Sequence, residues 1–169
     1  MIKSRAMTKH IETIDNLDNA SLIAQLRGLG VRHLRAISSV EDVSPADPVT
    51  LINSPAQHPE ARFREALIPL FRRQPHLADH IPQLVASLEE PAAQVLSHLY
   101  TAAVYLQRLW RGVLGLYLGD SPLLPDYFGQ SFGLPDPVDY FGEVGLHALA
   151  THFREQTGYE WFSAYEAVI

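Results

Sequence analysis

Apolar residues recur at helical spacing along most of the chain, three to four positions apart. The clearest case is the stretch 57–73, where one face of the expected helix is apolar and most of the arginines lie off that face. The apolar positions are Phe63, Ala66, Leu67, Leu70 and Phe71. Similar patterns predict helices over 16–30, 77–88, 90–118 and 142–157, and shorter ones over 44–53 and 159–169.

Residues 31–37 carry the least decisive pattern. Their apolar positions fit either a spacing of three or a short alternating strand, and we favour a helix or irregular chain. No other stretch alternates convincingly, so the sequence predicts an all-α fold. We expect a single compact multi-helix domain over residues 16–169, preceded by a poorly ordered polar leader at residues 1–15.

The longest pattern, 90–118, is apolar around most of its circumference. Its polar positions share one narrow stripe: Gln94, Ser97, Thr101 and Arg108. A helix that is apolar on most sides is surrounded by others, so we expect it to be the central helix of the domain. Residues 99–118 are also long enough to cross a bilayer. Because Arg108 and Arg111 would then each cost about 2.5–3.5 kcal/mol near the midplane, we predict a buried helix and no membrane span.

Glycines and prolines predict several boundaries. Gly28 and Gly30 suit the end of the first helix, because glycine readily adopts the positive φ of a helix C-cap. The pair Ser44 and Pro45 suits the start of the second helix. Pro69 lies inside an apolar stripe and should kink that helix, because proline has no N–H to donate.

The stretches 57–73 and 77–88 together resemble one HEAT-type helical repeat, with a proline-kinked first helix and a short turn. The resemblance covers about a fifth of the chain, and no second copy follows at the period of such arrays. It implies a HEAT-like first half of the domain and a helical face that binds other proteins.

Composition narrows the classes of function. The 169 residues suit one domain that buries its core without a metal or disulfide. The absence of cysteine excludes disulfides and a thiol nucleophile. A net charge of −6 disfavours broad binding to nucleic acid or anionic membranes. Residues 1–19 lack the apolar core of a secretory signal, so we expect a cytoplasmic protein.

Two copies of DYFG, at 126–129 and 139–142, flank a glycine-rich stretch. Aspartate can cap a helix, the aromatic pair can pack, and glycine can adopt a positive φ. We therefore expect a loop that packs two helices together as a hydrophobic plug beneath the central helix, and residues 123–132 within it can form a short helix capped by Ser121 and ended by Gly133. The alternative is an aromatic surface that receives a partner, because aromatic residues are enriched in interface cores.

The aromatic C-terminal pattern, 159–169, offers the same choice between docking on the domain and entering the groove of a second chain. In the partner-binding interpretation, the DYFG copies and the C-terminal pattern together supply the contact residues. These are Tyr127, Phe128, Phe132, Tyr140, Phe141, Trp161, Phe162 and Tyr165.

Within the glycine-rich stretch, GQSFG matches the G-x-S-x-G pattern of a hydrolase nucleophile elbow, with Ser131 as the nucleophile. The elbow requires a buried strand before it and a helix after it. Pro125 interrupts the first, while Pro135 and Pro137 interrupt the second. We assign no catalytic residue.

Two further groups of residues indicate alternative functions. His76 and His80 lie four positions apart, the spacing of two zinc ligands on one helix face. A third ligand would have to come from elsewhere, such as Asp79, Glu89 or His98, so we predict no metal and no cofactor and retain the pair only as weak candidates. Arg27, Arg32 and Arg35 form a basic cluster that could contact phosphate, although a solvated face is the simpler interpretation.

The sequence thus favours a non-enzymatic helical interaction or regulatory module that binds another protein or itself. One alternative is an enzyme, either a metal-dependent hydrolase or a ribonuclease-like component of a toxin system. The other is a weak nucleic-acid-binding regulator that uses the arginine cluster.

Overall fold

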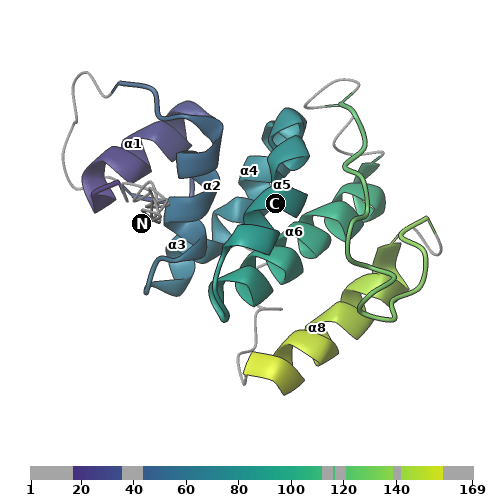
Figure 1. The fold of residues 1–169 in the computed structure, drawn as a ribbon. Coiled ribbons are helices and arrows are strands. Elements are labelled where there is room, and N and C mark those ends of the chain that lie inside the picture. The colour runs from purple at the N-terminus through teal and green to yellow at the C-terminus, as the bar shows by residue number, and fades with distance from the viewer. Residues whose placement is uncertain (1–16, 36–43, 112–115, 117–120, 139–141, 158–169) are drawn as a thin grey trace, which may run out of the picture.

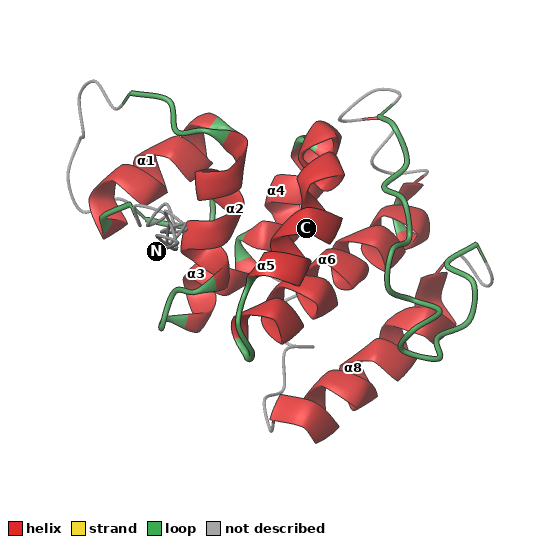
Figure 2. Ribbon diagram, in the orientation of Figure 1, coloured by secondary structure: helices red, strands yellow, loops and turns green. Residues whose placement is uncertain are grey.

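All regular structure in the described part of the chain is helical (Figures 1 and 2). The computed structural model describes residues 17–35, 44–111, 116, 121–138 and 142–157, so the expected leader and the C-terminal aromatic pattern lie outside it. The helices are α1 (Asn19–Gly28), α2 (Pro48–Ala56), α3 (Ala61–Glu65), α4 (Leu67–Arg73), the 3₁₀ helix η1 (Pro75–His80), α5 (Ile81–Ser87), α6 (Ala92–Leu109) and α8 (Glu143–Thr157). The predicted all-α fold is confirmed.

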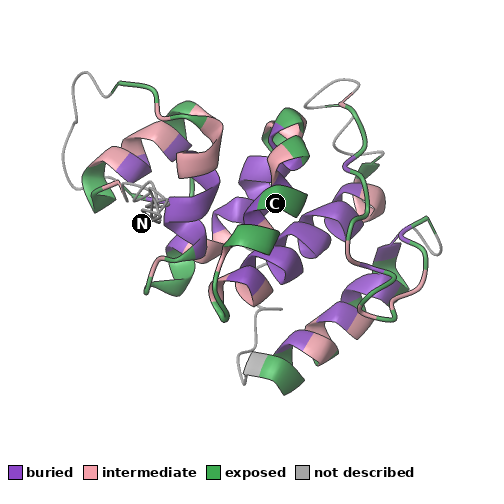
Figure 3. Cartoon of the chain, viewed as in Figure 1, coloured by how far each residue is buried: buried purple, intermediate pink, exposed green. Residues whose placement is uncertain are grey.

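Helix α6 is the centre of the packing, as its apolar circumference predicts. Helices α2, α3, α4, α5 and α8 all contact it. Every residue from Leu96 to Gln107 is buried, which Figure 3 shows as a nearly continuous buried stretch of ribbon. Figure 1 shows α8 running beside α6, toward the opposite end of the view from α1.

Two aspartates determine where the first helices begin. Asp18 accepts hydrogen bonds from the backbone and the hydroxyl of Ser21, and Asp47 does the same with Thr50. Helix α2 therefore starts after Asp47, at Pro48, three residues later than the expected start at Pro45. The hydroxyl of Ser21 lowers the pKa of Asp18, and that of Thr50 lowers the pKa of Asp47, so both caps stay ionised in mild acid.

Helix α1 ends at the glycines, as expected. Gly30 has φ +93° and donates to the Arg27 carbonyl, while Val31 donates to the Leu26 carbonyl. This is the Schellman arrangement, and its apolar pair, Leu26 and Val31, is fully buried. The following residues, 32–35, are irregular, in agreement with one of the two interpretations of that stretch.

The proline kink also appears where the sequence predicts it. The helix containing Pro69 divides at Ala66 into α3 and α4, and its apolar stripe is fully buried. The second member of the HEAT-like pair begins as η1 and continues as α5. Both α4 and α5 pack mainly against α6, so the resemblance covers the two helices and not the packing of a repeat array.

Among the described residues, no helix combines the length and the hydropathy that crossing a bilayer requires. The C-terminal part of the expected helix 90–118 lies mostly outside the described residues. What is described of it, Ala92–Leu109, forms the core of a helical domain.

Gly145 lets α8 approach α6 closely. A Cβ atom at this position would lie 1.8 Å from Cε1 of Tyr105, whose ring is fully buried. We predict that Gly145→Ala lowers the free energy of unfolding by about 1–3 kcal/mol, because the ring has no room to move. Chemical denaturation measures the change.

The matched control is Gly28→Ala, in α1, where an added Cβ meets nothing within 4 Å. This change should leave stability unaltered or raise it by up to about 1 kcal/mol, since alanine favours helix. Equal effects of the two substitutions would contradict the close packing of α8 on Tyr105.

Candidate functional site: the segment 121–138 on helix α6

The segment 121–138 is irregular chain that lies between α6 and α8 (Figures 1 and 2). The short helix considered for 123–132 does not form, because the segment contains only turns and irregular chain. Its prolines remove backbone donors, and Asp126 bonds to the N–H groups of Phe128 and Gly129, at 3.3 and 2.8 Å. Aspartate thus caps a turn here and not a helix.

Two buried tyrosines of α6 hold the segment by its carbonyl groups. The hydroxyl of Tyr100 donates to the Pro125 carbonyl at 2.7 Å, and that of Tyr105 donates to the Pro135 carbonyl. Both rings are fully buried, and burial raises the pKa of Tyr100 and of Tyr105. The two hydroxyls therefore stay protonated and remain donors across the physiological range.

The last turn of α6 makes a second attachment. Gln107 donates to the Pro122 carbonyl at 2.9 Å and accepts from the Leu124 N–H at 2.8 Å. Arg108 donates to the Leu124 carbonyl at 2.7 Å and to the Gln107 side-chain oxygen at 2.9 Å. Gln107 is 5% exposed, so both ends of its amide are used in a nearly dry site.

Three of these acceptors are proline carbonyls, at positions 122, 125 and 135. Proline has a carbonyl to satisfy but no N–H, so a proline-rich strip of chain needs donors from its surroundings. Helix α6 supplies them from tyrosine hydroxyls, an amide and a guanidinium. Donors on α6 therefore meet carbonyl acceptors at several points along the segment.

The aromatic residues of the segment divide between core and surface. Phe132 stacks on His98 with ring centroids 4.5 Å apart, and Phe128 meets Tyr100 edge-on at 6.1 Å. Tyr127 stacks on Tyr100 at 5.6 Å yet remains 38% exposed. Phe128 and Phe132 thus contribute to the expected hydrophobic plug, and Tyr127 presents an aromatic face to solvent.

Behind Phe132, a histidine pair joins α6 to α8. His98 Nε2 lies 2.9 Å from His152 Nδ1, and the rings are stacked with centroids 5.1 Å apart. His98 Nδ1 lies 2.7 Å from the Gln94 carbonyl oxygen. His98 is 2% exposed, and burial lowers its pKa, as does the neighbouring His152.

The sequence-predicted residues fall in different places. Tyr127, Phe128 and Phe132 come together on α6, whereas Tyr140, Phe141, Trp161, Phe162 and Tyr165 lie outside the described residues. Ser131 is exposed and donates to the Phe128 carbonyl at 2.8 Å, and the described chain before it contains no strand. An elbow geometry is absent there.

The metal candidates do not share a face. His76 and His80 lie in η1, where residues four apart point about 120° away from each other because the 3₁₀ helix has three residues per turn. Within the described ranges, no group of three His, Cys, Asp or Glu side chains could hold a metal ion.

The basic cluster is only partly free for a ligand. Arg27 donates to the Leu34 carbonyl at 2.9 Å and so helps to fold the chain after α1. Arg32 and Arg35 are exposed on that same stretch of chain.

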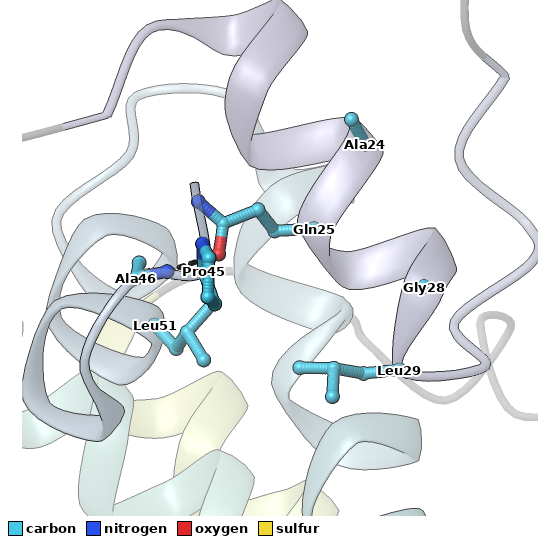
Figure 4. Close-up of a pocket in the computed structure, with 7 residues that line it drawn as sticks. All are labelled: Ala24, Gln25, Gly28, Leu29, Pro45, Ala46 and Leu51. Atoms are coloured by element: carbon cyan, nitrogen blue, oxygen red, sulfur yellow. Dashed lines mark hydrogen bonds between the residues drawn. The ribbon is translucent and has the colours of Figure 1, made fainter. Parts of the chain in front are cut away.

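A hollow of about 410 Å³ lies between α1 and the chain before α2 (Figure 4). Gln25 crosses it and holds the opposite wall, since its side chain accepts from the Ala46 N–H at 2.7 Å and donates to the Ser44 carbonyl. None of the residues that line it carries a carboxylate, an imidazole, an amine or a hydroxyl. This hollow offers no group for acid–base or nucleophilic chemistry.

Comparisons with protein-family models, with curated proteins and with solved structures find no match to this chain.

The polar stripe of α6 contains the sequence signal for part of the attachment. Gln94, Ser97, Thr101 and Arg108 form the predicted stripe, whereas His98 and Gln107 are not among its predicted members. Polar residues on a helix that is otherwise apolar mark the face where a neighbour needs hydrogen bonds. His98, between Gln94 and Thr101, lies on that face.

Gln107 allows the attachment to be tested. We predict that Gln107→Leu lowers the free energy of unfolding by about 2–4 kcal/mol, because it leaves the buried Leu124 N–H and the Pro122 carbonyl without a hydrogen-bond partner. Chemical denaturation of both proteins measures the loss. Gln83→Leu, at an exposed position of α5, is the control and should change stability by no more than about 0.5 kcal/mol. A neutral Gln107→Leu would show that the segment does not depend on these bonds.

Proposed function

We propose that the protein is a non-enzymatic helical interaction module that uses the segment 121–138 to bind another protein. The observation that carries the proposal is the set of large apolar side chains exposed on an anchored, irregular segment. Leu123, Tyr127 and Val138 are 44%, 38% and 72% exposed, and Val144, in the first turn of α8, is 45% exposed. Large apolar side chains exposed along one stretch of chain favour an interaction site.

Anchoring supports a binding role. Leu123 lies between the two residues bonded to Gln107, and Tyr127 lies two residues after the carbonyl bonded to Tyr100. A surface already held in one shape loses little conformational freedom when it binds, so less of the interaction energy is lost to ordering. The hydrogen bonds from α6 thus favour binding as well as folding.

Charge indicates the chemistry of the partner. From Gly112 to Leu146 the chain has five carboxylates, Asp120, Asp126, Asp136, Asp139 and Glu143, and no lysine, arginine or histidine. Of these, Asp126, Asp136 and Glu143 are described and exposed. Apolar side chains with an acidic surround are complementary to a protein surface on which lysine or arginine flanks apolar residues.

The first test is binary binding. A partner is identified by crosslinking in the source cells, purified, and titrated against the full chain. Val138→Asp should weaken the complex at least about tenfold, because it places a charge in the apolar contact. Ala86→Asp, at an exposed position of α5, is the control and should leave affinity unchanged. Equal affinity of both variants would remove this surface from the proposal, and self-association in place of a heterologous complex would overturn the basic-partner chemistry.

The second test concerns charge. Asp136→Asn keeps an oxygen that can accept from the Val138 N–H, so the turn is preserved while the charge is lost. Affinity should fall a few-fold at low salt and converge with that of the parent protein at high salt, as screening predicts. Titrations at two ionic strengths measure this. A variant that binds the same partner equally well in low salt would contradict the electrostatic part of the proposal.

A further inference from the structure

The histidine pair, His98 and His152, is the only described contact between two titratable side chains of α6 and α8. It also supports the segment 121–138, because Phe132 stacks on His98 and lies 5.2 Å from the ring of His152. Three parts of the fold, α6, α8 and the segment, thus meet at one pair of imidazoles.

Hydrogen-bond chemistry determines where the protons are. The Gln94 carbonyl can only accept, so His98 Nδ1 carries a proton. In the neutral ring Nε2 is then bare, and it accepts from a protonated Nδ1 of His152. The remaining nitrogen, His152 Nε2, is the one place where the pair can take a proton without losing a hydrogen bond.

A second added proton has no place in this geometry. It would have to go to His98 Nε2, where its N–H would face the N–H of His152 Nδ1 across 2.9 Å. Two imidazolium rings at that distance repel each other, and neither has an acceptor in the other. His98, at 2% exposure, cannot find water instead while α8 remains docked.

The surroundings supply no compensating charge among the described residues. The neighbours of His98 on α6 are Gln94, Ser97 and Thr101, all uncharged. The carboxylates of the segment, Asp126 and Asp136, act on Tyr105 and Arg108. On α8 the other titratable and charged side chains near the pair are His147, Arg154 and Glu155. Among the described groups, only the charge of the neighbouring His152 contributes to the lowered pKa of His98.

From this geometry we infer that the histidine pair is a pH-sensitive contact: protonation of both rings separates α8 and Phe132 from α6. The inference stands apart from the proposed function, because it concerns the docking of α8 whether or not a partner binds there. In the docked form the hydrogen bond with His152 keeps His98 neutral. In mild acid the doubly protonated pair favours the open form.

Proton linkage determines how the stability of the docked state changes with pH. Burial lowers the pKa of His98 in the docked state, below its ordinary value of 6.5, so the open state binds protons more readily. The stabilisation is therefore present above that ordinary value and is lost as the pH falls. The caps Asp18 and Asp47 do not confuse the measurement, because their hydrogen bonds lower the pKa of both carboxyls and keep them ionised in mild acid.

Hydrogen exchange tests the inference on the full chain. Amide protection in α8 and in α4 is measured at about pH 7.5 and about pH 5, each corrected for intrinsic exchange. The protection of α8 relative to α4 should fall at least about tenfold in acid. An unchanged ratio would show that the His152 side chain simply swings out while α8 stays docked, and would overturn the inference.

Two variants test whether the pH dependence of α8 protection arises from the histidine pair. In His152→Asn the side chain can donate to neutral His98 or, when its amide is turned, accept from a protonated one, so the acid-dependent fall should disappear. His147→Asn, on the same helix and exposed, should retain the fall. If the fall persisted in His152→Asn and disappeared in His147→Asn, the pH dependence would arise from a group other than the histidine pair.

If His152→Asn does not fold, nitrogen NMR of the wild-type imidazoles remains decisive. Both rings should carry their neutral-state proton on Nδ1, and His98 should stay neutral until the α8 signals change. A protonated His98 in a docked α8 would overturn the inference.

Discussion

The structure depends on one constraint: irregular chain packed against a buried helix must have its carbonyl groups hydrogen-bonded. The segment 121–138 forms no helix of its own, yet it packs against α6, in which every residue from Leu96 to Gln107 is buried. Helix α6 meets the constraint with side-chain donors, from Tyr100 to Arg108, that reach carbonyls spread over the segment. Proline suits the other side of this arrangement because it adds an acceptor without adding a donor.

Helix α6 also carries His98, a buried polar group whose hydrogen-bonding pattern changes with protonation. A tyrosine hydroxyl or an amide keeps its hydrogen-bonding pattern throughout the physiological range, but an imidazole changes from acceptor to donor when it gains a proton. The contact between two imidazoles therefore depends on pH, whereas the neighbouring contacts of Tyr105 and Gln107 do not. Stable attachment of the segment and conditional attachment of α8 can therefore coexist on one helix.

The proposed binding role draws its support from the described surface. The hollow beside α1 lacks reactive side chains, and the paired imidazoles are engaged with each other and with a backbone carbonyl. The exposed apolar residues lie instead on the anchored segment and the start of α8, in a region rich in carboxylates. Exposed apolar side chains on a backbone held by hydrogen bonds, with carboxylates beside them, support the proposed recognition surface.

The sequence alone determined the helical class, the central position of 92–109, the glycine end of α1 and the kink at Pro69, because these depend on periodicity and on local backbone chemistry. It misplaced the start of α2, since Asp47 and Ser44 offer equivalent local signals. It also left open whether residues 123–132 form a short helix capped by Ser121 or remain a packing loop, in which Asp126 in fact caps a turn. Only the tertiary structure decided that choice, and only it paired His98 with His152, 54 residues away, because the hydrogen-bond partners of a buried polar group come from whatever the fold brings beside it.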